Sequence, residues 1–263
     1  MDLGIAGKVA LVGASANGLG LATAERFAME GCDVAICDVN AAALDAARER
    51  VAGAAAGGRV QGWQVDLRDA SSIERLVSSV TEELGPVDIL VTNSGGPPPG
   101  SFEDSTDAKW QLSFELTFLS AVRLIRGVLP GMKERKWGRI VNFTSRALRE
   151  PIPNLMLSNA IRLAVAGMAK TLAAEVAPYG ITVNNLGPGP TSTDRALELA
   201  AARAAKKGIS LDDELKATES RIPRGRMARP EEQAAVAVFL ASEMASHITG
   251  AGLIVDGGET GSL

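Results

Sequence analysis

The sequence has few of the residues that most often carry enzymatic chemistry. Its 263 residues include 2 cysteines, 1 histidine and 1 tyrosine. One histidine and two cysteines cannot form the usual structural zinc site, which takes four such ligands, so we expect no metal. A Ser-His-Asp or Cys-His hydrolase would have to use His247, which we expect instead to be a surface or interface residue.

The two cysteines also exclude a disulfide framework. Cys32 and Cys37 lie in one short apolar stretch, where we expect both to be buried as small apolar residues. A chain without disulfides is typical of a reducing compartment, so the sequence favours a cytoplasmic location. The N-terminal segment lacks the charged region and the cleavage site of a secretory signal peptide.

The charge balance and the hydropathy pattern exclude two classes of partner. The formal net charge is −4, and no basic cluster is large enough to indicate binding to nucleic acid. No run of about 18 apolar residues occurs, so we expect no transmembrane helix and no membrane partner.

Short apolar segments alternate with longer helical ones along the whole chain. The short segments are rich in Val and Ile, which is typical of strands buried on both faces of a parallel sheet. We expect strands at Val9–Val12, Asp33–Cys37, Val60–Gln64, Ile89–Thr92, Arg139–Phe143, Thr182–Asn185 and Leu253–Val255. We expect helices at Leu19–Met29, Ala41–Val51, Ser71–Glu83, Gln111–Arg135, Ser158–Ala177 and Glu231–Ala241. This alternation predicts a single α/β domain over residues 1–263, a Rossmann-type doubly wound sheet of seven parallel strands.

The segment 191–230 departs from the alternation. It contains no expected strand, and we predict two helices, Arg195–Lys206 and Leu211–Ser220, joined around Gly208. Insertions beyond the carboxyl ends of the strands cover the ligand crevice of a doubly wound sheet, which favours a substrate lid within the domain. A surface hairpin without a ligand role is the alternative.

A glycine-rich loop connects the first expected strand to the first expected helix. Glycines there allow the backbone to approach a pyrophosphate, and the helix N-terminus adds amide N–H groups and a positive dipole end. The loop residues that we expect at a dinucleotide cofactor are Gly13, Ser15, Asn17, Gly18, Leu19 and Gly20.

Asp38 ends the second expected strand, eighteen residues beyond Gly20. A carboxylate at this place can accept both ribose hydroxyls of an adenosine and repels a 2′-phosphate, so the sequence favours NAD over NADP. The alternative is a strand-end turn or cap residue, because Asn40 and a run of alanines follow.

Five features of the chain carry recognisable motifs in a fixed order. They are the loop Gly13–Gly20, the segments Val65–Leu67, Asp88–Gly95 and Gly187–Thr193, and a C-terminal pair, Arg229–Glu232 with Ile248–Gly258. Together they resemble the short-chain dehydrogenase/reductase family and its ketoacyl-reductase-like branch. The resemblance covers residues 7–258 and implies a nicotinamide cofactor. It implies further cofactor contacts at Val39, Asp66, Leu67, Asn93, Ser94, Gly95, Arg162, Pro188, Gly189, Thr191 and Thr193.

The phosphate loop departs from the pattern of the family that it resembles. In an ungapped register Ala14 replaces the family's first glycine and Gly13 replaces its threonine. In the other register Gly13 keeps the glycine's role and one residue is inserted. Either way, we expect the turn against the diphosphate to be altered.

The catalytic residues depart further. The resemblance implies an active site of Asn, Ser, Tyr and Lys, in which the Tyr transfers the proton and the Lys holds the nicotinamide ribose. Ser145 matches the Ser, whereas Ser158, Arg162 and Glu115 stand at the positions of the Tyr, the Lys and the Asn. Tyr179, the one tyrosine, lies in a Pro-Tyr-Gly turn that no register moves into this site.

The replacements change what the site can do. A serine hydroxyl is a far poorer acid than a phenol, and an arginine stays protonated, so neither restores the usual proton relay. Ser145, Ser158 and Arg162 instead form a hydrogen-bonding and electrostatic site. Glu115 either forms an ion pair with Arg162 or acts as a base through water.

The pattern favours an NAD-dependent oxidoreductase that acts on a small carbonyl or hydroxyl compound. A carboxylate-bearing substrate is favoured by Arg146, Arg149 and Arg162, which we expect near the site. The alternatives are a non-redox lyase or isomerase on the same scaffold, or a catalytically silent nucleotide-binding protein. The resemblance also implies a homotetramer or homodimer, assembled through the helices Gln111–Arg135 and Ser158–Ala177 and the last strand.

Overall fold

The short apolar runs of the sequence form one parallel sheet in the computed structural model, which describes residues 2–262. The strands are β1 (Val9–Val12), β2 (Asp33–Asp38), β3 (Val60–Gln64), β4 (Ile89–Thr92), β5 (Gly138–Phe143), β6 (Ile181–Pro188) and β7 (Gly252–Val255). Their order is β3-β2-β1-β4-β5-β6-β7, so the predicted doubly wound sheet of seven parallel strands is confirmed.

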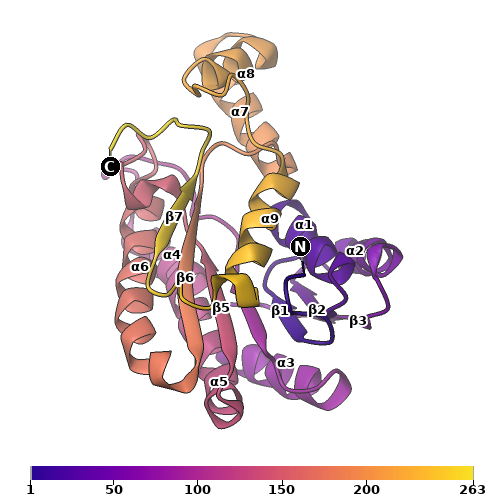
Figure 1. Ribbon diagram of the computed structural model, residues 1–263. Helices are drawn as coiled ribbons and strands as arrows, with labels where there is room; N and C mark the ends of the chain where they lie inside the picture. The colour runs from indigo at the N-terminus through magenta and orange to yellow at the C-terminus, as the bar shows by residue number, and fades with distance from the viewer. Residues whose placement is uncertain (1, 263) are drawn as a thin grey trace.

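Helices cover both faces of this sheet (Figure 1). They are α1 (Gly18–Met29), α2 (Ala41–Ala54), α3 (Ala70–Glu83), α4 (Asp107–Ser113), α5 (Ser120–Arg135), α6 (Met156–Val176), α7 (Asp194–Lys207), α8 (Leu211–Glu219) and α9 (Pro230–Leu240). Alternate residues of β1 face opposite cores. Ala10 and Val12 pack toward α1, α2 and α9, whereas Val9 and Leu11 pack toward α3, α5 and α6.

The expectation of strands buried on both faces is correct only in the middle of the sheet. β1, β4 and β5 are buried along their whole length. The residues of β3 are half-buried or exposed, and Leu253 of β7 is exposed. These two strands form the edges of the sheet, where each has only one neighbouring strand.

The predicted helix Gln111–Arg135 starts earlier and is not α-helical throughout. Thr106 accepts a hydrogen bond from the N–H of Lys109, and this cap begins α4 at Asp107. A π-helical turn, η1 (Phe114–Leu119), then separates α4 from α5. Such turns are rare and frequently occur at functional sites. The candidate residue Glu115 lies in this turn.

The strand order reverses between β1 and β4, and doubly wound sheets bind ligands at the carboxyl ends of the strands at such a point. α7 and α8 project from this end of the molecule as a hairpin (Figure 1). Gly208 ends α7 in the left-handed conformation, at a φ of 67°. The Glu214 carboxylate of α8 accepts from Arg203 and Lys207 of α7, each at 2.7 Å, which holds the hairpin together.

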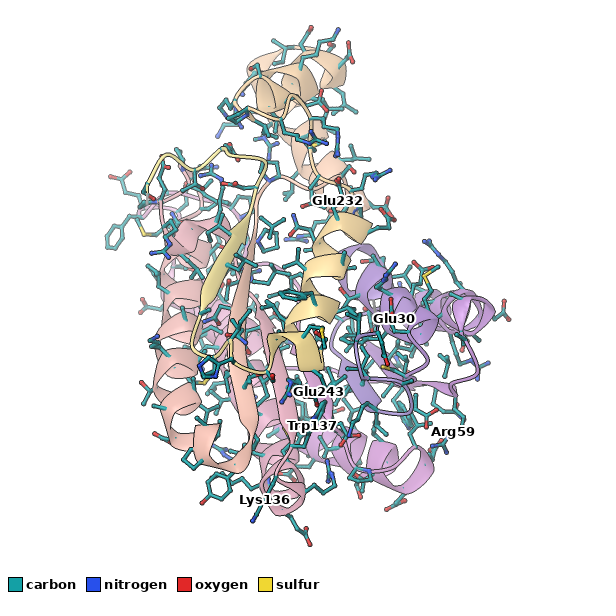
Figure 2. All side chains as sticks on the ribbon, viewed as in Figure 1. Glu30, Arg59, Lys136, Trp137, Glu232 and Glu243 are labelled. Atoms are coloured by element: carbon teal, nitrogen blue, oxygen red, sulfur yellow. The ribbon has the colours of Figure 1, made fainter. Side chains whose placement is uncertain are left out.

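The single histidine lies at the opposite end of the sheet. Figure 2 shows Trp137 and Glu243 together at the end far from the α7–α8 hairpin, where the Trp137 indole N–H donates to the Glu243 carboxylate. His247 is exposed and lines a hollow beside these two residues. It is therefore remote from the carboxyl ends of the strands.

Both cysteines are buried, as expected. Burial raises the pKa of the Cys32 thiol to about 12 and that of the Cys37 thiol to about 12, so neither is a thiolate nucleophile at neutral pH. Within residues 2–262, no group of His, Cys, Asp and Glu side chains could hold a metal ion. No helix in that part of the chain is long and apolar enough to cross a membrane.

Candidate active site

The loop between β1 and α1 has the features of a phosphate cradle. Gly18 has a φ of 56°, and a Cβ on Gly20 would lie 2.3 Å from the carbonyl oxygen of Ala14, so both positions require glycine. Asn17 precedes α1 without a side-chain cap, unlike Asn40 before α2, whose side chain accepts from an amide of its helix. The first N–H groups of α1 are therefore free to bind an anion such as a diphosphate.

Ala14 is the point at which this loop is strained. Its φ of 45° lies in the left-handed region, which residues with a Cβ rarely adopt. Asn93, at the end of β4, stabilises the turn because its side-chain amide donates to the carbonyl oxygens of Gly13 and Ala14 at 3.1 Å each. The predicted alteration of the loop is thus a backbone conformation suited to glycine but occupied by alanine.

The side chain of Ser15, one of the residues expected at the cofactor, is used inside the protein. Ser15 is fully buried; its hydroxyl donates to the Val12 carbonyl at 2.8 Å and accepts from the Cys37 amide at 3.0 Å. Its own N–H donates to the Cys37 carbonyl. Because these groups are all used inside the protein, Ser15 fastens the loop to β2 rather than to a ligand.

The groups expected around the adenosine gather at the carboxyl end of β2 and β3. Asp38 accepts from the amide of Ala16 in the loop at 3.3 Å and from the amide of Asn40 at 3.1 Å, which leaves lone pairs on both oxygens. Val39 beside it is 61% exposed, an unusual exposure for a β-branched apolar side chain at the end of a strand. An adenine ring could cover such a side chain.

The next segment supplies one polar and one apolar group at this place. The carboxylate of Asp66 pairs with the exposed Arg68 at 2.6 Å, and the hydrogen bonds from Arg68 lower the pKa of Asp66. Leu67 is buried in the core on the α3 side. Any contact of Leu67 with a cofactor would therefore use its backbone.

Arg162 joins Ser158 to the carboxyl end of β5, the strand that leads to Ser145. Ser145 lies two residues beyond this strand, and its hydroxyl accepts from the N–H of Ala147 at 3.2 Å. Arg162 of α6 donates from Nε to the Ser158 hydroxyl at 3.2 Å and from Nη1 to the carbonyl of Phe143, the last residue of β5, at 3.0 Å. One guanidinium thus joins the start of α6 to the strand that carries Ser145.

The electrostatic state of Arg162 is unusual. Burial, and then the positive charge of the nearby Arg195, lower the pKa of the Arg162 guanidinium to about 10. That value still keeps the group cationic at neutral pH. The site therefore holds a fixed positive charge beside two hydroxyl groups.

The predicted ion pair between Glu115 and Arg162 is not formed. Glu115 instead accepts a hydrogen bond from the Gln111 side chain, one turn back on the same helical path, at 2.6 Å. The π-helical turn that contains Glu115 changes the direction in which its side chain leaves the helix, which a regular helical repeat does not predict.

Arg195 is a residue of this site that the sequence did not reveal. It lies in the first turn of α7, and its Nη2 donates to the carbonyl of Gly96, in the loop after β4, at 3.1 Å. Arg146, expected to help bind a carboxylate, is already paired with Glu259 at 3.0 Å. The sequence placed Arg195 at the start of a helix but gave no sign of which loop it would meet.

The segment Gly187–Thr193, expected at the nicotinamide end, lies close to several parts of the candidate site. Gly187 would bring a Cβ within 2.8 Å of the Ser145 carbonyl oxygen, and Gly189 within 2.4 Å of the Asp256 Cβ, so the chain passes close to both. Thr193 caps α7 through its hydroxyl, and its methyl group would lie 3.4 Å from a Cβ on Gly18. β6, the hairpin and the phosphate loop therefore meet around one space.

The other residues expected at the nicotinamide end lie in the same region. The Ser94 hydroxyl donates to the Gly95 carbonyl, and a Cβ on Gly95 would contact Leu116 of η1. Pro188 ends β6, and the Thr191 hydroxyl donates to the carbonyl of Gly189 at 3.0 Å. These residues thus lie at or just beyond the carboxyl ends of strands β4 and β6.

Comparisons with known proteins agree with this architecture. A family model described as enoyl-(acyl carrier protein) reductase matches residues 13–260. The D-beta-hydroxybutyrate dehydrogenase of Cupriavidus necator is 33% identical over 253 residues, which cover 96% of this chain and 97% of that protein. The 2,3-dihydro-2,3-dihydroxybenzoate dehydrogenase of Bacillus subtilis is 31% identical over 257 residues, 98% of this chain and 97% of that protein.

One solved structure also resembles this chain along its whole length. The L-sorbose reductase of Gluconobacter frateurii, complexed with NADPH and L-sorbose, has a TM-score of 0.95 to this chain. The two are 35% identical in sequence, and the match covers 100% of both chains.

The strain at Ala14 predicts an unusual response to glycine. A left-handed conformation costs a residue with a Cβ about 1–2 kcal/mol, whereas glycine normally destabilises by the entropy that it adds to the unfolded chain. We expect the free energy of unfolding of Ala14→Gly to be about 1 kcal/mol higher than that of the control Ala16→Gly in the same loop. Urea denaturation measures both, and equal destabilisation by the two variants would contradict strain at Ala14.

Proposed function

Since the chain belongs to the short-chain dehydrogenase/reductase family, we propose that it transfers a hydride between a nicotinamide cofactor and a small carbonyl or hydroxyl compound. The observation that carries this proposal is that Arg162 joins Ser158 to the last carbonyl of β5, two residues before Ser145, in a fold whose first loop fits a dinucleotide diphosphate. The two buried thiols, neither in a disulfide, support a cytoplasmic location.

The cofactor that we propose is NAD, with NADP less favoured. The free amides at the start of α1 would hold the diphosphate, and Asp38 would accept the hydroxyls of the adenosine ribose. A 2′-phosphate would be repelled by the same carboxylate. The related L-sorbose reductase was solved with NADPH, so the preference of this chain rests on Asp38 alone.

The chemistry that we propose uses charge stabilisation in place of a tyrosine. When bound, the nicotinamide would supply the hydride. The hydroxyls of Ser145 and Ser158 both act as acceptors toward the protein, so their protons remain free to be donated to a substrate oxygen. The cation of Arg162 would stabilise the negative charge that develops on that oxygen, the role of a preorganised electrostatic group.

Glu115 is proposed as the base that exchanges protons with the substrate through water. The ion pair that would have made it structural is not formed, and its bond to Gln111 leaves acceptor capacity on the carboxylate. The segment 191–230 is proposed as the substrate lid, because Arg195 and Thr193 at its start reach the loops of the site.

A carboxylate-bearing substrate is supported by the charges of the site. Arg162 and Arg195 are cationic and lie beside the reacting groups, although Arg146 is neutralised by Glu259. Two of the relatives are named for hydroxybutyrate and dihydroxybenzoate, which are both carboxylates. A short oxo acid or hydroxy acid fits these features.

The proposed chemistry predicts which substitutions stop turnover. Removing one hydrogen-bond donor or charge that stabilises a transition state typically costs about 10²–10³-fold in rate. We expect Ser145→Ala and Arg162→Gln to lower kcat/KM by about 100-fold, and Glu115→Gln by about tenfold or more. Absorbance at 340 nm with a panel of oxo acids and NADH measures the rates. Glu103→Gln removes an exposed carboxylate as a control and should change nothing.

Two results would contradict the proposal in different ways. Unchanged turnover in Glu115→Gln would remove Glu115 from the mechanism but leave the electrostatic site intact. Binding of NADH, seen by its fluorescence, without turnover on any substrate would favour the lyase, isomerase or silent nucleotide-binding alternative.

The role of Asp38 predicts a change in cofactor preference. Without its carboxylate a 2′-phosphate is no longer repelled, so Asp38→Ala should lower the ratio of kcat/KM for NADH to that for NADPH by about tenfold or more. Asp45→Ala, which removes an exposed carboxylate from α2, should keep the ratio. A wild-type enzyme that already prefers NADPH would show that Asp38 does not select NAD.

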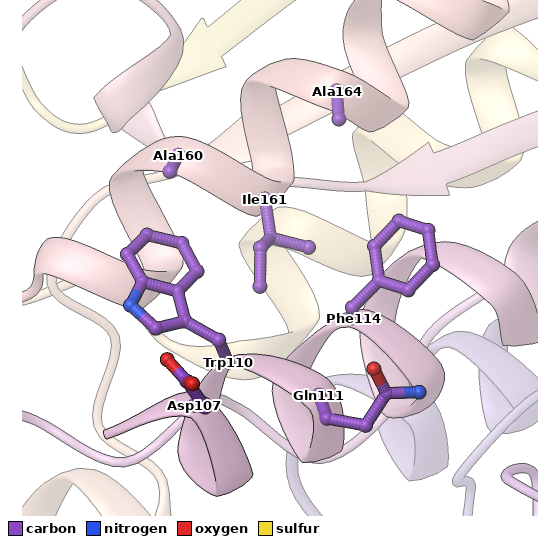
Figure 3. Close-up of a pocket in the computed structure, with 7 residues that line it drawn as sticks. All are labelled: Asp107, Trp110, Gln111, Phe114, Ala160, Ile161 and Ala164. Carbon is purple, nitrogen blue, oxygen red and sulfur yellow. The ribbon is translucent and has the colours of Figure 1, made fainter. Parts of the chain in front are cut away.

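We further propose a homotetramer or homodimer assembled through the helical segment α4–η1–α5, through α6 and through the last strand, β7. Figure 3 shows an open, largely apolar groove between α6 and the segment formed by α4 and η1, lined by Trp110 and Phe114 on one side and by Ala160, Ile161 and Ala164 of α6 on the other. Small residues along α6 allow close approach of a partner helix, and Leu163 on the same helix is 49% exposed.

Light scattering tests this assembly. We expect a mass that is two or four times the 27.3 kDa of one chain. Ala164→Arg places a charge in the groove and should lower the mass toward that of one chain, whereas Ala205→Arg on the exposed face of α7 should not. A wild-type mass of one chain would contradict the proposal.

A further inference from the structure

Two guanidinium groups approach the same glycine from different elements. A Cβ on Gly96 would lie 3.6 Å from Nε and 3.8 Å from Nη2 of Arg195, and 4.0 Å from Nη2 of Arg162. The two Nη2 atoms are therefore within about 8 Å of each other, close enough for their charges to interact strongly in a partly buried site. Arg162 comes from α6, and Arg195 comes from α7 of the lid.

Neither of these charges is neutralised by the protein. Across residues 2–262, no carboxylate lies within ion-pair distance of Arg162 or Arg195. Other arginines of this region do have partners, since Arg146 pairs with Glu259 and Arg203 pairs with Glu214. The two cations at Gly96 thus stand out as a pair of like charges without a counter-ion.

Several of their N–H groups remain available. Arg162 uses Nε and Nη1 for Ser158 and Phe143, and Arg195 uses Nη2 for the Gly96 carbonyl. Within the described chain, Nη2 of Arg162 and Nε of Arg195 make no hydrogen bond. These are also the nitrogens nearest the Cβ position of Gly96, where the absence of a side chain leaves space. An anion placed there could accept from both groups at once.

Like charges held together without a counter-ion destabilise each other, and burial of one of them adds to the cost. The positive charge of Arg195 and burial together lower the pKa of Arg162 to about 10, which reports this unfavourable interaction. An anion between the two groups would replace the repulsion by two attractions. The local loop is suited to a fixed site, because Pro97, Pro98 and Pro99 directly follow Gly96 and restrict its backbone.

We propose that a carboxylate of the substrate binds between Arg162 and Arg195 at Gly96, and that Arg195 determines specificity by selecting an anionic substrate. This inference deepens the proposed function and rests on it. Since Arg195 belongs to the lid and Arg162 to α6, the same carboxylate fastens the lid over the site. Arg162 also contacts Ser158, so the carboxylate lies one or two carbons from the reacting carbonyl, as in a 2-oxo or 3-oxo acid.

A direct test compares ligands that differ only in charge. Isothermal titration calorimetry would measure the binding of acetoacetate and acetoacetamide, and of pyruvate and pyruvamide, to the full chain with and without NAD. An oxidised cofactor cannot reduce these probes, so binding is measured without turnover. We expect at least one carboxylate to bind about tenfold or more tightly than its amide. No preference for either carboxylate in the wild-type protein would overturn the proposal.

Variants show whether the carboxylate preference depends on Arg195 itself or on the general positive charge of the lid. Arg195→Gln should reduce the carboxylate preference to about onefold, and Arg195→Lys should retain only part of it, because an ammonium keeps the charge but lacks the fork that reaches Gly96 and the anion together. Lys206→Gln removes one positive charge from the same helix and should leave the preference unchanged. Equal melting temperatures would show that the variants fold alike. A preference that survives Arg195→Gln would overturn the proposal.

The anion at this place could instead be the diphosphate of the cofactor, and the same variant distinguishes the two. If Arg195→Gln weakens NADH binding about tenfold while the carboxylate preference persists, the two arginines serve the cofactor and the proposal is wrong. The calorimetric result does not depend on hydride transfer. Carboxylate preference without any turnover would therefore support the anion site and contradict the proposed oxidoreductase activity.

Discussion

The guanidinium of Arg162 is the group on which the candidate active site depends. It donates to Ser158 on its own helix and to the last carbonyl of β5, so it fixes the start of α6 against the strand that leads to Ser145. An arginine keeps its proton at neutral pH even when its pKa is lowered to about 10, whereas a lysine beside a tyrosine can take part in a proton relay. The site is therefore built around a fixed positive charge, and stabilisation of a developing oxyanion is the chemistry that it suits best.

The candidate site contains two energetically unfavourable features. Ala14 keeps a left-handed backbone at the loop where a diphosphate would bind, and Arg162 and Arg195 hold like charges near Gly96. Such local costs persist only where the surroundings fix the geometry. Here Asn93 fastens the loop to β4 and Ser15 fastens it to β2, and the Glu214 ion pairs hold α7 and α8 together. The strained Ala14 and the pair of like charges both lie where the proposed cofactor and substrate would place negative charge.

Much of the fold follows from local sequence patterns that do not depend on the details of tertiary packing. The central strands β1 and β4 are nearly continuous apolar runs, as expected where helices cover both faces, and the alternation with helices indicates parallel strands with crossovers. The sequence-based prediction fails where contacts with neighbouring elements determine the burial of a strand or the geometry of a helix. Strand β7 is as apolar as the central strands but lies at an edge, and the helix that carries Glu115 contains a π-helical turn that the 3.6-residue repeat does not reveal.

The sequence by itself determined the doubly wound sheet and the position of the glycine-rich loop after the first strand, and it has Ser158 and Arg162 where the resemblance implies a tyrosine and a lysine, since each is set by residue type and spacing along the chain. The tertiary structure decided which charges meet: Arg195 reaches Gly96, Glu259 neutralises Arg146, and Glu115 bonds to Gln111 instead of Arg162. The physical reason is that contacts between distant segments depend on how each helix is rotated and on which rotamer its side chains adopt. Packing sets both, and sequence spacing does not.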